Sequence, residues 1–398
     1  MTHRARIVLV FCHAVAAGCV SLRAGRAAGE DNLVIAPAPA YVLTVLPTLG
    51  GDNSDAAAIN NRGQIVGSSN LATEHHPSHA FLFDHGKMID LGTLPGGTLS
   101  YAAAINDKGQ IVGAADYHPD PYPPAYELIP YHAFLFDHNT MQDLGTIAGI
   151  SSQAYAINNL GQVVGSSDSI PYDPTTPDRG HAFLYDQGRM RNLGGTGAAA
   201  WAINDRGQIV GRSFFNQPEP DGTDAVHITR FNAHGKPQDL GTFDGYLSEA
   251  NAINAAGTIA GIVRSHTNDR KHDATRAVLI REGHVIELGD VVGGRGGAVP
   301  LALNDREQVV GEASDANGDS CAFVWQDGQM LNLNDLVGRE SLTANHLKTL
   351  TRADGINNRG QIVGTAATTD GHQRGFLLTP LGASTKPDVM AGRGGRNP

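Results

Sequence analysis

Histidine side chains are the first candidates for chemistry, because four of them recur in the same local context. Each opens a short apolar stretch such as His-Ala-Phe, whereas later stretches of the same kind begin with Arg276, Cys321 or Arg374. The four are His79, His132, His181 and His227. Neutral imidazole is a common ligand of zinc and copper. These residues would therefore form a metal site if the fold brought them together.

Other motifs with chemical meaning are incomplete. The run from Asp315 to Asp319 alternates oxygen ligands as a calcium loop does, but its glycine comes early and no glutamate follows at the required distance. The chain has no zinc-protease motif, nucleophile elbow, phosphate loop or dinucleotide fingerprint. Cys321 stands in an apolar, strand-like context that is typical of a small core residue. The sequence predicts no metal and no cofactor, and it identifies no catalytic residue.

The element that must position any functional side chain is a β-hairpin that recurs seven times. In the second copy the turn is Asn106-Asp107-Lys108-Gly109, with asparagine at the first position and glycine where a left-handed backbone is needed. The central Ile or Leu of the copies stands at 59, 105, 157, 203, 253, 303 and 356. A period near 50 residues indicates a repeat array. Turn formation explains the recurrent Asn and Asp better than a ring of polar ligands does.

Each period contains four strand-like segments, here named strands a to d. In the second repeat they cover residues 102–106, 110–114, 132–137 and 141–145. Four short strands per repeat are typical of a β-propeller blade. Proline occurs in or near strands a and d, at Pro47, Pro237 and Pro300, and is absent from the interiors of strands b and c. Because proline cannot donate to a strand ladder, a and d are predicted to be the edges.

The strand count predicts how the array ends. Strands a, b and c occur seven times, but only six strands d follow them, and the missing one resembles residues 45–51 near the N-terminus. The sequence therefore predicts an all-β, seven-bladed β-propeller over residues 41–380, closed by the N-terminal strand in the last blade. Strand c then lies roughly 10 Å outside strand a. The histidines could not converge on one ion, so we interpret them as structural, for example bonding a neighbouring loop.

Three short motifs recur with these repeats. They are Ala-Ile-Asn-x-x-Gly-Gln-Ile-Val-Gly, the His-Ala-Phe units at His79, His132 and His181, and the Asp-Leu-Gly-Thr units at Asp90, Asp143 and Asp239. Over residues 41–380 they resemble the extracellular repeats of the HAF family, which is named after the tripeptide. The resemblance implies a bacterial secreted repeat protein, and the family contributes no established activity or catalytic residue.

The N-terminus predicts export. Arg4 and Arg6 precede an apolar run from Ile7 to Val20, as in a signal peptide over residues 1–29. A lipoprotein-type cleavage box at Cys19, which would provide a lipid anchor, is the alternative to ordinary cleavage near Ala28. We expect a linker at 30–40, a disordered tail at 381–398, no transmembrane span in the mature protein, and a location outside the cell or in the periplasm or cell envelope.

Composition limits the partners. The formal net charge is −11 and no basic run is present, which argues against nucleic acid. A monomer that binds an extracellular protein or glycan is expected.

Variable positions of strand a, between small residues, would surround the ring axis on the face of the d-to-a and b-to-c loops. They are Tyr101, Gln153, Tyr155, Trp201, Glu249, Asn251, Arg352 and Asp354.

Two functions remain open from the sequence. The favoured one is a non-catalytic binding or scaffold module. The alternative is an extracellular carbohydrate-active lyase or hydrolase with its site at the channel mouth, in which aromatic residues stack on sugar rings. That chemistry would need an acidic pair such as Glu249 with Asp354.

Overall fold

The regular secondary structure of the described chain is almost entirely β-strand. The computed structural model describes residues 40–73, 75, 77–117, 130–168, 180–218, 224–232, 236–266 and 273–382. These residues form 28 strands and two short helices, so the predicted all-β fold class is confirmed. The predicted signal peptide, Cys19, nearly all of the linker and the tail from 383 on lie outside the described residues, as do most of the long loops at 116–130 and 169–179.

Consecutive strands form four-stranded antiparallel units, as expected for the blades of a β-propeller. Repeat 1 contains β2 (Gly50–Ile59), β3 (Ile65–Leu71), β4 (Ser78–Asp84) and β5 (Lys87–Asp90). Repeat 2 contains β6 (Ser100–Ile105), β7 (Ile111–Asp116), β8 (Tyr131–Asp137) and β9 (Thr140–Asp143). Repeat 3 contains β10 (Ser152–Ile157), β11 (Val163–Ser167), β12 (His181–Asp186) and β13 (Arg189–Asn192). The predicted strands of repeat 2 thus agree with the structure to within two residues.

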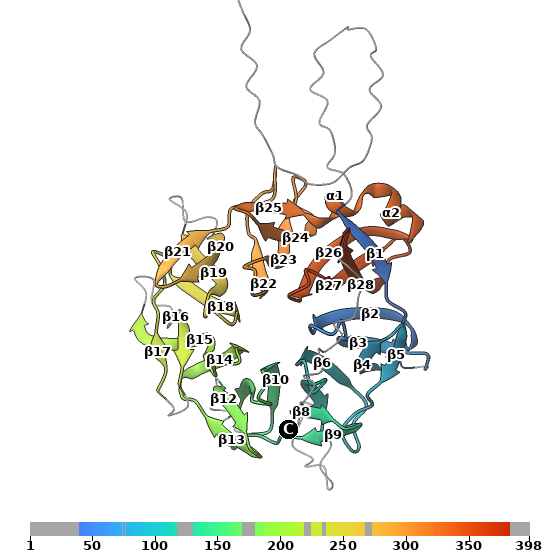
Figure 1. Ribbon diagram of the computed structural model, residues 1–398. Coiled ribbons are helices and arrows are strands. Elements are labelled where there is room, and N and C mark those ends of the chain that lie inside the picture. The colour runs from blue at the N-terminus through green and yellow to red at the C-terminus, as the bar shows by residue number, and fades with distance from the viewer. Residues whose placement is uncertain are drawn as a thin grey trace, which may run out of the picture. The chain divides into compact units, whose positions relative to one another are not determined.

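Repeats 4 and 5 share one eight-stranded sheet, in which the single parallel pair Val226 and Leu247 joins the two units. Repeat 4 contains β14 (Thr196–Ile203), β15 (Ile209–Pro218), β16 (Asp224–Phe231) and β17 (Gln238–Asp239). Repeat 5 contains β18 (Leu247–Ile253), β19 (Ile259–His266), β20 (Asp273–Arg281) and β21 (His284–Glu287). Repeat 6 contains β22 (Val299–Leu303), β23 (Val309–Ser314), β24 (Ser320–Gln326) and β25 (Gln329–Asn332). Figure 1 shows the units following one another in chain order, with strand a of each on the inner side.

The last sheet combines both ends of the described chain. It contains β26 (Leu347–Ile356), β27 (Ile362–Thr368), β28 (Gln373–Pro380) and, beside β28, the N-terminal strand β1 (Tyr41–Val45). The backbone N–H of Leu46 donates to the Gly375 carbonyl, just as the N–H of Leu91 donates to Ala80 in repeat 1. The sequence match that aligns Leu46 with Leu91 therefore agrees with the hydrogen bonding, but the strand itself covers residues 41–45 rather than 45–51. It ends before Pro47, which has no N–H to continue the ladder.

Two short helices lie between repeats 6 and 7. They are α1 (Leu333–Val337) and α2 (Arg339–Ala344), and the side chain of Asn332 caps α1 by accepting from the Asn334 N–H. The sequence did not predict them, because five- and six-residue helices carry too little periodicity to recognise. Their buried Leu333, Leu336 and Val337 pack into the core of the last sheet.

Each strand a carries a β-bulge at the same place. In repeat 2 the ladder passes from Ala102 to Ala104 and leaves out Ala103. The partner residue in strand b is Gly113, where an added Cβ would lie 2.0 Å from the Tyr101 carbonyl oxygen. Only glycine tolerates this close backbone approach, which explains the glycine that ends each hairpin motif.

Buried aromatic and hydroxyl groups join neighbouring repeats. The phenylalanine of strand c is fully buried in five repeats, as Phe81, Phe134, Phe183, Phe323 and Phe376. A buried serine at the start of strand a bonds back to the preceding repeat: Ser100 Oγ accepts from the Ala80 N–H at 2.8 Å and donates to the Gly92 carbonyl at 2.6 Å. Repeats are thus held together by packing and by polar contacts of the main chain.

Candidate functional site

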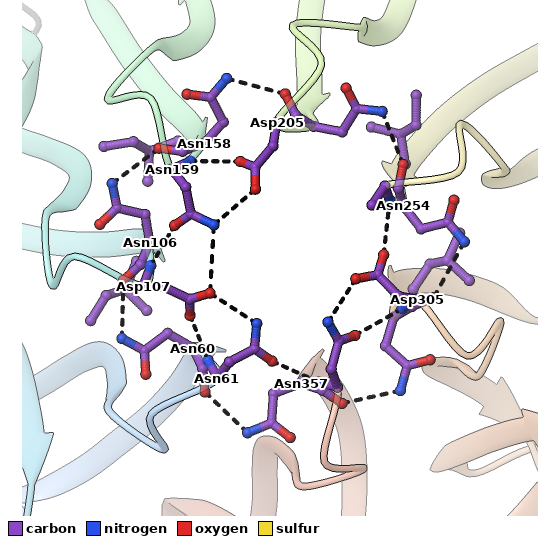
Figure 2. A pocket seen from close by; sticks show the side chains of 18 of the residues that line it. Asn60, Asn61, Asn106, Asp107, Asn158, Asn159, Asp205, Asn254, Asp305 and Asn357 are labelled. Carbon is purple, nitrogen blue, oxygen red and sulfur yellow. Dashed lines mark hydrogen bonds between the residues drawn. The ribbon is translucent and has the colours of Figure 1, made fainter. Parts of the chain in front are cut away.

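The turn end of the repeats contains a pocket of about 200 Å³ surrounded by asparagine and aspartate. The Asn60 amide oxygen accepts from the N–H groups of Arg62 and Gln64, which confirms the interpretation of this residue as a turn former. Its amide nitrogen also donates to the Asn106 carbonyl of the next repeat at 3.0 Å. The sequence reasoning missed this second bond, which depends on the neighbouring repeat. Figure 2 shows the side chains arranged around the opening.

The next turn position forms a second set of bonds between repeats. The backbone N–H and the side chain of Asn61 donate to the two oxygens of Asp107 at 2.8 and 3.0 Å. The N–H of Asp107 donates in turn to Asn159. Ala255 interrupts the series, because its methyl group offers no acceptor to Asp205. Most polar groups at this end therefore bond to one another, which leaves few of them for a ligand.

Three of the four recurrent histidines, His79, His132 and His227, bond aspartates of strand d. His132 Nδ1 lies 2.9 Å from both carboxylate oxygens of Asp143, and Asp143 also accepts from the Gly145 N–H at 2.7 Å. Burial raises the pKa of Asp143, but the bonds from His132 and Gly145 outweigh it, so that the pKa lies below its usual value. Equivalent pairs join His79 to Asp90 and His227 to Asp239.

These pairs agree with the structural role expected for the histidines, although the partner is the adjacent strand d rather than a neighbouring loop. In repeat 5, Arg276 replaces the histidine and pairs with Glu287. Within the described residues no three His, Cys, Asp or Glu side chains are grouped as metal ligands. Cys321 is buried, and burial raises the pKa of its thiol to about 11, as expected for a core residue.

The bulges decide where the predicted ligand residues lie. Tyr155, Trp201, Asn251 and Asp354 are the residues that the ladder leaves out in repeats 3, 4, 5 and 7. A bulge turns one side chain away from the regular alternation of the strand. Half of the predicted set therefore owes its placement to one recurrent irregularity, which the alternation of small and large residues did not reveal.

One cavity, of about 260 Å³, lies between repeats 3 and 4 and is aromatic. The rings of Tyr155 and Trp201 lie 4.2 Å apart between centroids, and the Arg212 guanidinium lies 5.8 Å from the Trp201 ring. The Tyr155 hydroxyl bonds Ser166 at 2.8 Å, and Gln153 lines the same cavity. We name these residues, Gln153, Tyr155, Trp201 and Arg212, the aromatic pocket.

The aromatic pocket lies at the ends of the strands away from the turns. Ser151 and Ser152, at the start of strand a, line it together with Asp168, which follows strand b, and Gly180, which precedes strand c. Arg212 also pairs with Glu249 of repeat 5 at 2.5 Å. The sequence reasoning missed Arg212 because it considered only strand a. Arg212 directly follows Gly211, the glycine of strand b, so polar residues at this position of the repeat would have identified it.

A second cavity, of about 560 Å³, is polar and charged. Asp55, Glu312 and Arg352 line it, together with Ser320, Thr351, Thr365 and Gln373. Arg352 pairs with Asp354 at 2.6 Å. Burial raises the pKa of Asp354 to about 6, despite the opposing effect of Arg352. Burial also raises the pKa of Asp55, against a hydrogen bond from Ser68.

We name Asp55, Glu312, Arg352 and Asp354 the acidic cluster. The enzymatic alternative would need an acidic pair such as Glu249 with Asp354. Each of these carboxylates is occupied by a different arginine, Arg212 for Glu249 and Arg352 for Asp354. The groups that affect the pKa of Asp354 are Arg352, Asp55 and Glu312.

Four predicted residues line neither cavity. Glu249 and Asp354 pair with the lining arginines Arg212 and Arg352, and the other two are Tyr101 and Asn251. Tyr101 packs against Tyr131 with ring centroids 5.5 Å apart, and burial raises the pKa of its hydroxyl. Asn251 donates from its side chain to the Pro300 carbonyl at 2.8 Å, so it joins repeats 5 and 6. The predicted set thus comprises four residues that line the two cavities, two that pair with lining arginines and two that make structural contacts.

Comparison with known proteins gives a partial family match. The family described as "Protein of unknown function (DUF3466)" matches residues 144–289. No curated protein sequence matches the chain. No helix within the described residues has both the length and the apolar character needed to cross a membrane.

Several solved structures are similar at 10–12% sequence identity. The uncomplexed acylaminoacyl peptidase of Pyrococcus horikoshii aligns with a TM-score of 0.48 and 12% identity over 79% of this chain and 50% of the peptidase, so the chain spans about half of that protein. The β-propeller domain of the Trilobed protease from Pyrococcus furiosus aligns with a TM-score of 0.48 and 12% identity, over 72% of this chain and 84% of that domain. YCF48 bound to D1 peptide aligns with a TM-score of 0.47 and 10% identity, over 87% of this chain and 97% of YCF48.

Proposed function

We propose that the chain forms a closed seven-bladed β-propeller of the HAF type. The support comes from contacts between its first and last repeats. Asn357 donates to the Asn60 carbonyl and the Asn358 N–H donates to the Asn61 side chain, which repeats the pattern of internal neighbours. Strand β1 occupies the strand d position beside β28. Deleting residues 41–51 should expose the edge of β28 and cause aggregation, and unchanged melting and solubility would contradict closure.

We propose further that the protein is an exported binding module for a glycan. The observation that carries this proposal is the aromatic pocket. Tyr155 and Trp201 provide apolar ring surface, while Gln153, Ser166 and Arg212 provide hydrogen-bonding groups around it. Sugars present both apolar C–H faces and hydroxyl groups, so this combination suits them better than it suits a purely apolar ligand.

The contrast between the two ends of the repeats favours the same location. At the turn end, asparagine and aspartate side chains bond neighbouring repeats. At the other end, the Trp201 indole nitrogen and the Arg212 Nε have no hydrogen-bond partner among the described residues. Unsatisfied polar groups beside a cavity are typical of a site that a ligand or ordered water completes.

Binding to a panel of neutral oligosaccharides tests this function. Trp201→Ala should weaken binding of the selected glycan at least tenfold, which corresponds to about 1.4 kcal/mol. Val292→Ala is the control, because Val292 is 95% exposed on another d-to-a loop. Titration calorimetry would measure the affinity of each variant for the glycan. Absence of binding to every glycan, or equal affinity in the two variants, would contradict the proposal.

A hydrolase or lyase is the second candidate, and the acidic cluster favours it. A carboxyl group with its pKa raised to about 6, as for Asp354, suits a general acid. Asp354 is only 10% exposed and lies against Arg352, so binding is the better supported of the two functions. Release of shorter products from a bound glycan, lost in Asp354→Asn, would establish the enzymatic activity.

Export is proposed from the N-terminal sequence and from the HAF resemblance. Fractionation of cells that express the full chain would locate the protein, and Cys19→Ser would release it from the membrane if Cys19 carries a lipid. Accumulation of the unprocessed chain in the cytosol would contradict export.

A further inference from the structure

The acidic cluster has more negative than positive charge. Three carboxylates, Asp55, Glu312 and Asp354, surround one guanidinium, Arg352, which gives a net charge of −2 when all four are ionised. The only ion pair that these residues form within the described chain is the one between Arg352 and Asp354. The charges of Asp55 and Glu312 are therefore not neutralised by a direct contact.

The hydrogen bonds of these two carboxylates also leave acceptor capacity. Asp55 accepts from the Ser68 hydroxyl, and Glu312 accepts from the Ser320 hydroxyl at 2.6 Å. An ionised carboxylate has about four lone-pair positions. Both side chains line the cavity of about 560 Å³, so their remaining acceptors face a space that a small group can enter.

An independent observation comes from Asp354. Its side chain is only 10% exposed, and its Oδ2 has no hydrogen-bond partner among the described residues. Asp354 pairs through its other oxygen with Arg352, which lines the cavity, and it interacts electrostatically with Asp55 and Glu312. An unpartnered carboxylate oxygen in a buried cluster is costly unless a cation or donor compensates it.

We propose that the acidic cluster is a subsite for an ammonium group, and hence that the glycan carries free amino groups. An ammonium ion has three N–H donors and no acceptor, which matches acceptors from Asp55 and Glu312. The threonine hydroxyls and Gln373 that line the same cavity suit the neighbouring sugar hydroxyls. The formal net charge of −11 attracts a cationic ligand at long range.

This inference rests on the proposed glycan binding, and the two can fail separately. The aromatic pocket lies between repeats 3 and 4, whereas the residues of the acidic cluster come from repeats 6, 7 and 1. Figure 1 shows β10 and β14 on the other side of the opening from β26 and β2. Substitutions in one cavity therefore leave the residues of the other unchanged.

The test compares D-glucosamine with D-glucose and N-acetyl-D-glucosamine, using titration calorimetry on the full chain near pH 7. D-glucosamine should bind at least ten times more tightly than the two neutral sugars. Glu312→Gln and Asp55→Asn should each lower the ratio of D-glucosamine affinity to glucose affinity at least five-fold. Glu287→Gln is the matched control, because Glu287 is 57% exposed and pairs with Arg276 away from the cluster. Thermal unfolding verifies that each variant is folded.

Equal affinity for the amine and the neutral sugars would overturn the ammonium subsite while leaving glycan binding intact. A preference for D-glucosamine that survives both Glu312→Gln and Asp55→Asn in folded protein would also overturn it. Binding of n-butylammonium chloride that Glu312→Gln abolishes, with no binding of any sugar, would support the subsite and refute the proposed glycan function.

Discussion

The side-chain amide of Asn357 donates a hydrogen bond of 3.0 Å to the backbone carbonyl of Asn60, a residue 297 positions earlier in the chain. The same bond joins Asn60 to Asn106 at 3.0 Å and Asn304 to Asn357 at 3.1 Å. One residue type at one turn position thus shapes its own hairpin and holds the following repeat. Asn357 is 4% exposed, so these bonds are shielded from water.

Replacement of Asn357 by alanine should destabilise the protein strongly. The change removes two bonds that the amide oxygen accepts and two that the nitrogen donates. At about 1 kcal/mol of net stability each, the expected loss is about 2–4 kcal/mol, measured by urea unfolding. Asn254→Ala should cost less, because its bond to the Asn304 carbonyl is longer, at 3.4 Å. A smaller loss for Asn357→Ala than for Asn254→Ala would contradict this ranking.

Ala255→Asn should stabilise the protein. In the equivalent place Asn159 bonds both oxygens of Asp205, at 2.7 and 2.9 Å. An asparagine at 255 would accept from the Asp205 N–H and donate to Asp305, which adds about 1 kcal/mol. Ala256→Asn, at the adjacent exposed turn position, provides the control and should give no gain. Equal melting temperatures for the two variants would show that the hydrogen bonds missing at Ala255 do not lower the stability of the protein.

Asp143→Ala should cost more stability than Glu287→Ala. Asp143 accepts from His132 and from the Gly145 N–H, and the His132 side chain is only 12% exposed. We expect a loss of about 2 kcal/mol in chemical unfolding. The corresponding pair of Arg276 with Glu287 is exposed, so its loss should stay below about 1 kcal/mol. Similar losses would mean that the histidine pair is no more than a surface contact.

The Asp354 carboxyl should make stability fall as the pH rises from 4 to 6. Burial raises its pKa from 3.8 to about 6, so in this range the folded state binds the proton more tightly than the unfolded state does. Below pH 4 Asp354 is protonated in both the folded and the unfolded state, so the cost of ionising this buried carboxyl does not lower stability. Above pH 6 this cost reaches about 3 kcal/mol, because each pKa unit corresponds to about 1.4 kcal/mol.

Asp354→Asn removes this titration. The unfolding free energy of the variant minus that of the wild type should therefore increase between pH 4 and pH 6, as measured by urea unfolding at each pH. A difference that stays constant or decreases over this range would mean that the pKa of Asp354 is not raised.

The local structure follows from the amino-acid sequence alone. The Asn-x-x-Gly turns specify hairpins through backbone geometry, and the spacing near 50 residues specifies how often they recur, so strand number per repeat and strand positions could be predicted. The match of residues 45–51 to a strand d also anticipated the pairing of the N-terminal segment with β28, although the strand itself begins at Tyr41. These features depend on residues close together in the chain or on a motif repeated in full.

Which side chains share a cavity could not be predicted from the sequence, because it depends on long-range packing. The bulge that places Tyr155 and Trp201 arises from strand pairing, and the contact of Trp201 with Arg212 joins strand a to strand b. The sequence also did not show that Glu249 and Asp354 each form an ion pair with a different arginine. Such contacts depend on register and on the angle between neighbouring sheets. These are set by packing across repeats rather than by local sequence.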